Sequence, residues 1–406
     1  MDLKQRSKAQ NFFLILMMGA LNTITPISID MYLPAFPKIA EDLHTTVGNV
    51  ALSVSSYFLG FALGQILYGP LLDRYGRKRP LYIGLCFYIV ATIGCTLAHT
   101  IEFLWVIRFL QALSGCVAAV AAMAMVLDFF PQDKSAGIIS LLILILGASP
   151  LLAPTVGSFI IAAWNWQMVF ITLAIIAFAV LVLVFFFLPE GHPPDPSVSL
   201  MPKPIITVFR NILTEPRFYV YALAGTFSFA GLFAYVAGSP AVFMNEFQVG
   251  PKAYGGIFAL LAVGFVGNSQ FNHYLTRKFS NEAILKTVVT IQSIASVIFL
   301  IGVLNDWFGL VSVIVLLFII LACCGLTYPN AAAIAITPFP KNAGSASALL
   351  GFIQIGIGGV ISMCSGLLPF KGSLSLALTM TVFSVLALVI LVTGEKKAAS
   401  LRVVES

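Results

Sequence analysis

The chain has 406 residues, of which 59% are hydrophobic and only 9% are charged, and its mean hydropathy is +1.00. Soluble domains carry about a quarter charged residues, so this composition excludes a soluble globular protein and predicts a membrane protein. The net charge of +6 is not gathered into a basic cluster with interleaved aromatic residues, so it does not indicate nucleic-acid binding.

Apolar segments recur along the whole chain, each near or above the roughly 20 residues that a helix needs to cross a bilayer. They predict an all-α integral membrane protein with twelve transmembrane helices, over approximately residues 12–35, 48–72, 80–98, 102–128, 137–162, 165–188, 218–245, 253–273, 283–304, 307–335, 343–369 and 372–394. The first segment is too long for a signal-peptide core, and we expect it to stay in the mature protein.

The distribution of Lys and Arg predicts the orientation, because positively charged loops stay on the cytoplasmic side. If both termini are cytoplasmic, 18 of the 22 basic residues fall in cytoplasmic segments. Arg108 lies inside a span, and the outer loops hold only Lys38, Lys252 and Lys371. We therefore expect both termini in the cytoplasm.

Cysteine and histidine do not form a recognisable metal or disulfide pattern. All six cysteines fall within apolar spans, where Cys behaves as a small hydrophobic residue, and the four histidines lie near span ends. We expect neither a disulfide framework nor a metal site. No Ser/His/Asp set or phosphate-cradling loop indicates an enzyme.

The stretch "PEGHPPDPSVSLMPKP", from Pro189 to Pro204, is the longest polar and proline-rich part of the chain. Proline at this density favours an extended tether. It predicts an N-terminal six-helix bundle over 1–188, a cytoplasmic linker over 189–217 and a C-terminal six-helix bundle over 218–406 with a short cytoplasmic tail. The dipeptide "RK" at residues 77–78 recurs at 277–278, which favours two parallel repeats with a site between them at mid-membrane.

An aspartate stands near the end of the first span, in "TPISIDMYLPAF". No charged residue separates Phe12 from Asp30. One interpretation is a helix-end cap, since Pro34 follows shortly. The other is a carboxylate that faces the interior of the protein.

The short loop after the second span reads "GPLLDRYGRKRPL", from Gly69 to Leu81. By charge alone it is a tight turn with topology-setting residues. Gly69 would allow a close helix approach, and Asp73 would face the positive end of a neighbouring helix. Asp128, near the cytoplasmic end of span four, is at the right depth to pair with Arg77.

Span four carries "RFLQALSG", which places Arg108 about 9 Å inside the helix entry. An arginine at this depth is costly unless it faces a wet cavity or a partner, although it can also snorkel to the outer surface. Gln111 and Ser114 follow on roughly the same side, which favours a polar interior face. Asp30 lies about 27 Å along span one, so it and Arg108 both fall in the outer third of the membrane and can meet directly or through water.

Span five contains "GASPLLAPTVG", with glycine and proline at helical spacing. Such residues permit close packing and a bend, although they are also frequent in ordinary kinked membrane helices. The residues concerned are Gly147, Pro150, Pro154 and Gly157.

Several of these stretches resemble the major facilitator superfamily. The loop from Gly69 to Leu81 resembles its loop signature, and span five resembles the antiporter signature of its drug-exporting branch. The stretches "SIDMYLPAFPKIA", "FAYVAGSPAVFMNEFQVGPKAYGGIFAL" and "PNAAAIAITPFPKNAGSASALLGFIQ" resemble the bicyclomycin and chloramphenicol resistance branch. Two positions depart from the family pattern: Leu127 stands where Arg is frequent, and Asn22 where some relatives have an acid.

The resemblance implies a monomeric drug:proton antiporter in the bacterial inner membrane, with small-molecule drugs and protons as its partners and no cofactor. The proton- and substrate-binding residues would be Asp30 and Arg108, with Asn22 and Gln111. Independently of the resemblance, we expect aromatic and polar cavity walls, lined by Tyr57, Met123, Tyr235 and Gln354. The gating residues would be Gly69, Asp73, Arg74, Arg77, Asp128, Gly147, Pro150, Pro154 and Gly157. An exporter of a sugar, an amino-acid derivative or another metabolite is the alternative, and a non-transporting membrane protein is a third hypothesis.

Overall fold

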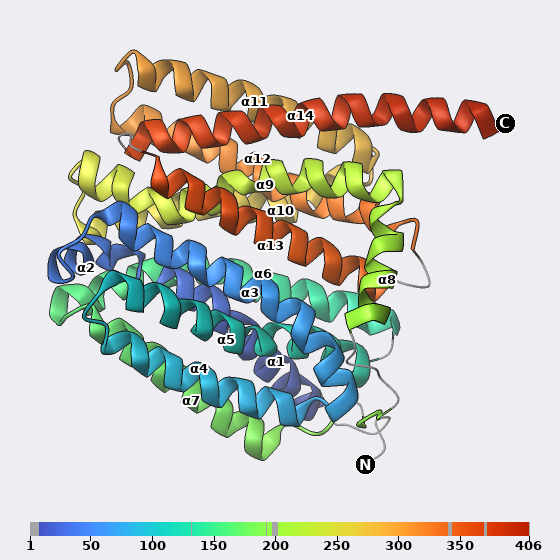
Figure 1. Cartoon of the computed structure of the whole chain (residues 1–406), viewed down its shortest axis with the longest axis horizontal. Helices are drawn as coiled ribbons and strands as arrows, with labels where there is room; N and C mark the ends of the chain where they lie inside the picture. Colours follow the sequence, from blue (N-terminus) through green and yellow to red (C-terminus); the bar gives the residue numbers. More distant parts are fainter. Residues whose placement is uncertain are drawn as a thin grey trace. The chain divides into compact units, whose positions relative to one another are not determined.

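The computed structural model of the chain describes residues 8–130, 132–191, 193–196, 202–339, 343–368 and 372–405. Within these ranges the protein is built of helices, and no strand occurs (Figure 1). The predicted all-α fold is therefore confirmed.

The first half contains seven α-helices and one short 3₁₀ segment within its described residues. They are α1 (Lys8–Asp30), η1 (Leu33–Ala35), α2 (Phe36–Asp42), α3 (Val47–Tyr75), α4 (Lys78–Thr96), α5 (Ile101–Phe129), α6 (Gln132–Ala163) and α7 (Gln167–Phe187). The first span ends as an α-helix at Asp30, five residues before its predicted end. Pro34 and Pro37 follow and cannot donate helical hydrogen bonds, so the chain continues as two short helices.

The second half begins with a helix inside the predicted linker. Its elements are α8 (Pro202–Leu213), α9 (Pro216–Pro240), the π-helical η2 (Ala241–Glu246), α10 (Pro251–Leu275), α11 (Asn281–Leu304), α12 (Leu310–Ile336), α13 (Ala343–Leu367) and α14 (Gly372–Glu405). Helix α8 overlaps the extended tether predicted for residues 189–204 only at the last three tether residues, 202–204. Pro202 and Pro204 lie in its first turn, where a missing N–H costs little, and Ile212 packs into the core of the second half.

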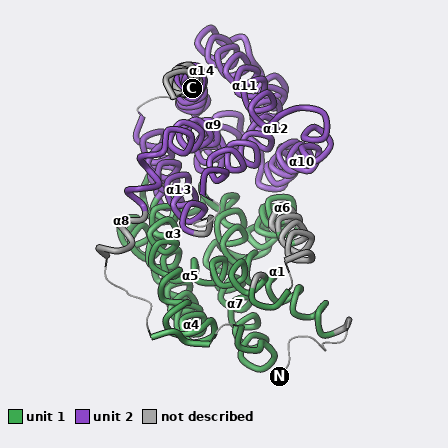
Figure 2. The backbone as a smooth tube through the Cα atoms, turned by 90° about the vertical axis from the view of Figure 1, so that its right-hand side faces the viewer, with its two compact units in different colours: residues 1–45, 56–200 green, residues 46–55, 201–406 purple. Residues whose placement is uncertain are grey.

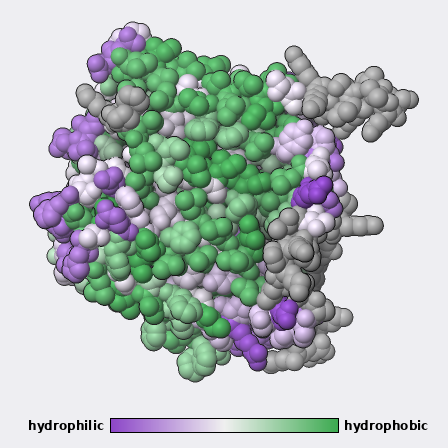
Figure 3. Space-filling model, in the orientation of Figure 1, coloured by the Kyte–Doolittle hydropathy of each residue, from purple (hydrophilic) through white to green (hydrophobic). Residues whose placement is uncertain are grey.

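The helices are long and apolar enough to span a bilayer. Eleven segments of the described chain meet that condition, and α6 contributes a shorter apolar stretch over Ser149–Ala163. Large hydrophobic side chains such as Phe87, Phe159 and Trp307 are exposed. In Figure 3 hydrophobic residues dominate the visible surface, and hydrophilic ones gather at its left and right margins. Such a surface suits lipid as the solvent.

The chain divides into two compact units, coloured in Figure 2. Unit 1 comprises residues 1–45 and 56–200, and unit 2 comprises residues 46–55 and 201–406. The main division falls inside the predicted linker, but the start of α3 is grouped with unit 2. In unit 1, α1 packs against α5 and α6, and α4 packs against α5 and α7. This packing brings the polar residues of α1, α4 and α5 together.

Candidate functional site

Arg108 lies on α5, about two turns from its start. The helix begins after Thr100, whose hydroxyl accepts a hydrogen bond from the N–H of Phe103. The side chain of Arg108 is completely buried, with 0% exposure. It therefore does not snorkel to the surface, and the interpretation of an inward-facing arginine holds.

The guanidinium of Arg108 is held by hydrogen bonds and aromatic rings. Its Nη1 donates to Gln111 Oε1 at 2.6 Å, and its Nη2 donates to the carbonyl oxygen of Ser28 at 3.0 Å. Its central carbon lies 4.4 Å from the ring centroid of Tyr32 and 4.3 Å from that of Tyr57. Each contact of this kind is worth about 0.5–2 kcal/mol. Two rings and a carbonyl thus stabilise a buried cation.

Asp30 is the last residue of α1 and is 4% exposed. It lies in the same unit as Arg108. The ion pairs among the described residues nevertheless do not include one between these two side chains. The direct contact considered from their depths is therefore not seen, and Arg108 reaches α1 at the backbone of Ser28 instead.

The polar contacts continue from Arg108 to α4. Gln111 is fully buried, and its Nε2 donates to Thr92 Oγ1 at 2.8 Å. The hydroxyls of Ser28 and Tyr88 are hydrogen-bonded at 2.5 Å. Ser114 donates back to carbonyls of its own helix, those of Leu110 and Gln111. Residues from α1, α4 and α5 form one buried polar cluster, which we call the Arg108 cluster.

One buried donor of this cluster, Nε of Arg108, has no hydrogen-bond partner among the described residues. Nδ2 of Asn22, two turns before Asp30 on α1, is likewise buried without a described partner, whereas the hydroxyl of Tyr57 lies close to those of Ser28 and Thr25. Buried polar groups are normally satisfied. The unused Nε of the buried cation suits a ligand or water that supplies an acceptor oxygen.

The remaining predicted binding residues are dispersed. Met123 is half-buried on α5. Tyr235 and Gln354 belong to unit 2 and are buried there, and the Tyr235 ring stacks on Phe258 at 5.3 Å. A cavity of about 300 Å³ in unit 2 is lined by small and polar residues, including Asn245 and Ser365, but by neither Tyr235 nor Gln354.

Tyr32 and Ser28 contact Arg108 but were not among the residues predicted from the sequence. Tyr32 lies two residues after Asp30, so an aromatic residue next to the acid was an available signal. Ser28 acts toward Arg108 through its backbone carbonyl, and no residue type reveals such a contact.

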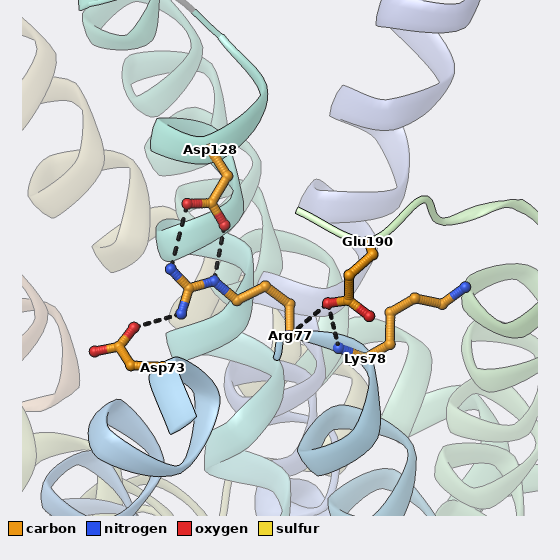
Figure 4. A network of polar contacts seen from close by, with 5 residues as sticks. All are labelled: Asp73, Arg77, Lys78, Asp128 and Glu190. Atoms are coloured by element: carbon orange, nitrogen blue, oxygen red, sulfur yellow. Dashed lines mark hydrogen bonds and ion pairs between the residues drawn. The ribbon is translucent and has the colours of Figure 1, made fainter. Parts of the chain in front are cut away.

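A second polar site lies at the loop between α3 and α4 (Figure 4). Arg77 Nε donates to Asp128 Oδ2 at 2.7 Å, and its Nη2 donates to Asp128 Oδ1 at 3.2 Å. Its Nη1 contacts Asp73 Oδ1 at 2.5 Å. The side chain of Arg77 is 8% exposed and that of Asp128 13%, whereas that of Asp73 is 53% exposed. The contact between Arg77 and Asp128 that their depths predicted is present.

The electrostatics of this network favour the charged arginine. Burial opposes the charge of Arg77, but its hydrogen bonds to Asp128 and Asp73 outweigh burial and raise its pKa. Arg77 therefore stays protonated, and the network is held by a charge-assisted, two-pronged pair.

The other residues of this loop are placed less tightly. Asp73 pairs with Arg77, which lies one helical turn further on. A Cβ at Gly69 would meet no described atom within 4 Å, so the expected close helix approach is not seen in the described part of the chain. Arg74 lies near the ring of Tyr75, at 5.9 Å, and its gating role stays a prediction.

The glycine- and proline-rich stretch falls on α6, which contains Pro150 and Pro154. A Cβ on Gly157 would lie 1.8 Å from the carbonyl oxygen of Met31, so only glycine fits this approach. The side-chain surroundings of Gly147 lie outside the described residues. The predicted gating stretch thus packs against the backbone directly after Asp30.

Unit 2 contains a neutral counterpart of the Arg108 cluster. Gln292 Nε2 donates to the carbonyl of Ser228 at 2.9 Å, and the Ser228 hydroxyl contacts Gln292 and Thr327. Ser228 and Gln292 stand 200 positions after Ser28 and Thr92, the same offset as the repeated "RK". The two halves thus share a buried serine carbonyl that accepts a hydrogen bond.

The fold and these two polar sites define a multi-pass membrane transporter built from two helical bundles. A sequence profile of the Major Facilitator Superfamily matches residues 18–363. Because this match covers most of the chain, the protein belongs to the Major Facilitator Superfamily.

The most similar curated proteins include bacterial resistance proteins. The chain is 27% identical to a bicyclomycin resistance protein homolog of Haemophilus influenzae over 391 residues, which cover 95% of this chain and 98% of the relative. It is 31% identical to multidrug resistance protein MdtL of Escherichia coli over 341 residues, 83% of this chain and 84% of the relative. The predicted resemblance to the bicyclomycin-resistance branch is confirmed.

A solved structure supports the fold. The crystal structure of a bacterial homolog of the human lysosomal transporter Spinster matches with a TM-score of 0.75 at 15% identity, covering 96% of this chain and 98% of that one. At this identity the likeness concerns the fold alone.

Proposed function

We propose that the protein exports small, mainly lipophilic drugs in exchange for protons by alternating access, with Asp30 as the protonation and substrate residue and Arg108 as its partner. The observation that carries the proposal is a buried carboxylate on α1 in the same unit as a buried guanidinium on α5. The relatives named as bicyclomycin and multidrug resistance proteins support drugs as the cargo.

Burial supplies a reason for coupling. A charged carboxylate without a partner is costly in an apolar interior, so Asp30 binds and releases its proton when the site opens to water. Arg108 touches the backbone of Ser28, two residues before Asp30. A substrate that engages Arg108 therefore alters the surroundings of the carboxylate, and drug binding favours release of the proton.

The Arg108 cluster also suits a particular substrate chemistry. Tyr32 and Tyr57 stack on the guanidinium of Arg108, whose Nε has no hydrogen-bond partner among the described residues. Such a site takes an apolar molecule that carries acceptor oxygens, because a few polar anchors on apolar walls tolerate varied ligands.

The charge network at the α3–α4 loop serves as the cytoplasmic gate in this proposal. Arg77, Asp73 and Asp128 hold α3, α4 and α5 together, and their separation would accompany opening to the cytoplasm. The proposal includes an inner-membrane location, cytoplasmic termini and a monomer, and Lys and Arg placement supports the orientation.

The test is substrate-driven proton movement in proteoliposomes that contain the purified protein and a pH-sensitive dye. A drug panel should move protons, and a matched panel of sugars and amino-acid derivatives should not. Proton movement with the metabolites alone would replace the proposal by metabolite export. Failure of both panels would remove proton-coupled export.

A further inference from the structure

The segment that follows α7 touches the charge network directly. Glu190 Oε1 accepts a hydrogen bond from the backbone N–H of Arg77 at 2.7 Å and another from that of Lys78 at 3.2 Å (Figure 4). Glu190 begins the connection between the two halves, more than 110 positions after these amides. A side chain of the linker thus binds the loop that carries Arg77.

These two amides belong to the start of α4. The helix begins at Lys78, and Arg77 at its N-cap position makes no side-chain capping bond. The first N–H groups of a helix lack partners within the helix, and a carboxylate there is favoured by both hydrogen bonding and the helix dipole. Glu190 therefore acts as the N-terminal cap of α4.

The same segment reaches the other two members of the network. The N–H of Asp195 donates to the carbonyl of Asp73 at 3.2 Å. A Cβ on Gly191 would lie 2.7 Å from Asp128 Oδ2. Residues 190, 191 and 195 consequently lie against all three residues of the network, within one compact unit.

The loop itself is shaped for this contact. Gly76 has a φ of +83°, a conformation that residues with a side chain rarely adopt. A Cβ there would also lie 3.2 Å from Glu190 Oε1. The same turn thus places Arg77 beside Asp128 and leaves space for the side chain of Glu190.

We propose that Glu190 is a positioning residue: by capping α4 it holds Arg77 where it reaches Asp128, so that the linker and the charge network form and separate together. A displacement of the linker at Glu190 then moves the start of α4 and, with it, Arg77. The consequence for transport rests on the proposed function, whereas the coupling itself does not.

Hydrogen exchange on the full-length protein in detergent tests the coupling without transport. Loss of a helix cap costs about 1 kcal/mol, so Glu190→Ala should speed exchange of the Arg77 and Lys78 amides about fivefold. Glu190→Gln keeps an acceptor oxygen but loses the charge. The exchange rates of the two amides in this variant should lie between those of the unaltered protein and those of Glu190→Ala. Glu215→Ala is the matched control, since Glu215 precedes α9 at its N-cap position without a capping bond, and should leave the exchange of both amides unchanged.

A double-variant cycle separates positioning from local helix capping. If Glu190 holds Arg77 against Asp128, Asp128→Asn should speed hydrogen exchange of the Asp195 amide. The effects of Glu190→Gln and Asp128→Asn on the free energy of amide exchange should then not be additive in the double variant. Additive effects, or unchanged exchange in Glu190→Ala, would overturn the proposal.

Transport supplies an independent readout. Glu190→Gln should lower the maximal rate of drug-driven proton exchange severalfold and change the half-saturating drug concentration less than twofold. A large change in the half-saturating concentration at an unchanged rate would contradict the positioning role. If no drug moves protons in the unaltered protein, the proposed function fails, and the exchange experiments still decide the coupling.

Discussion

Arg108 donates a hydrogen bond to the backbone carbonyl of Ser28, 3.0 Å away. The contact ties α5 to the last turn of α1, two residues before Asp30. Among the described residues the acid makes no ion pair, and the buried cation has an acceptor whose charge does not vary. Any movement of the end of α1 therefore changes the hydrogen bonding of Arg108.

Asp30→Asn should abolish drug-driven proton exchange, because the amide cannot take up or release a proton. The side chain keeps its size, so the protein should still elute as a single species on gel filtration. Asp306→Asn is the control: this exposed residue has a φ of +54°, which asparagine also tolerates. Unchanged exchange in Asp30→Asn would remove Asp30 from the coupling role.

Arg108→Lys should reduce transport about tenfold although the charge is kept. Lysine lacks the flat fork that stacks on Tyr32 and Tyr57 while it donates to Ser28 and Gln111, and the loss of stacking is worth about 1–2 kcal/mol. Initial rates in proteoliposomes measure the effect. A variant with full activity would show that only the charge matters.

Asp128→Asn should lower the free energy of unfolding more than Asp73→Asn does. Asp128 is the more buried partner of Arg77, and removal of one member of a buried pair costs about 3–5 kcal/mol. The pair with the exposed Asp73 is worth less than about 1 kcal/mol. Thermal unfolding in detergent should show this order.

In transport, Asp73→Asn should slow turnover with little change in drug affinity. A large loss of affinity at normal turnover would contradict the gating role of Asp73.

Gly157→Ala should destabilise the packing of α6 against the end of α1. The new methyl group would meet the carbonyl of Met31, and a backbone atom cannot move aside as a side chain can, so a cost at or above about 1–3 kcal/mol is expected. Gly267→Ala, on α10 with no atom within 4 Å of the new Cβ, is the control. Equal melting temperatures for the two variants would contradict the close approach.

The features that follow from the bilayer were predictable from the sequence. Because membrane spans must be long and apolar, their number and order could be predicted from the sequence. Depth along a span is set by the rise per residue, which is why the contact between Arg77 and Asp128 was foreseen although the two positions are 51 apart in sequence.

The contacts made through backbone atoms were not predictable. The carbonyl of Ser28 and the amides of Arg77 and Lys78 carry no signature of residue type, so the backbone partners of Arg108 and Glu190 were missed, whereas the side-chain partner Gln111 was expected on the same face as Arg108. A Cβ at Gly69 would meet no described atom within 4 Å, although its motif suggested a close approach. Helix α8 was missed because prolines in a first turn look the same, in sequence, as prolines in a tether.

The paired serine carbonyls imply that the two halves respond differently to voltage. The carbonyl of Ser28 accepts from a cation, whereas that of Ser228 accepts from the uncharged amide of Gln292. A transmembrane field exerts force on a charge, worth about 2.3 kcal/mol per elementary charge for each 100 mV, and almost none on an amide. Of these two buried clusters, only the one in the first half can be driven electrically.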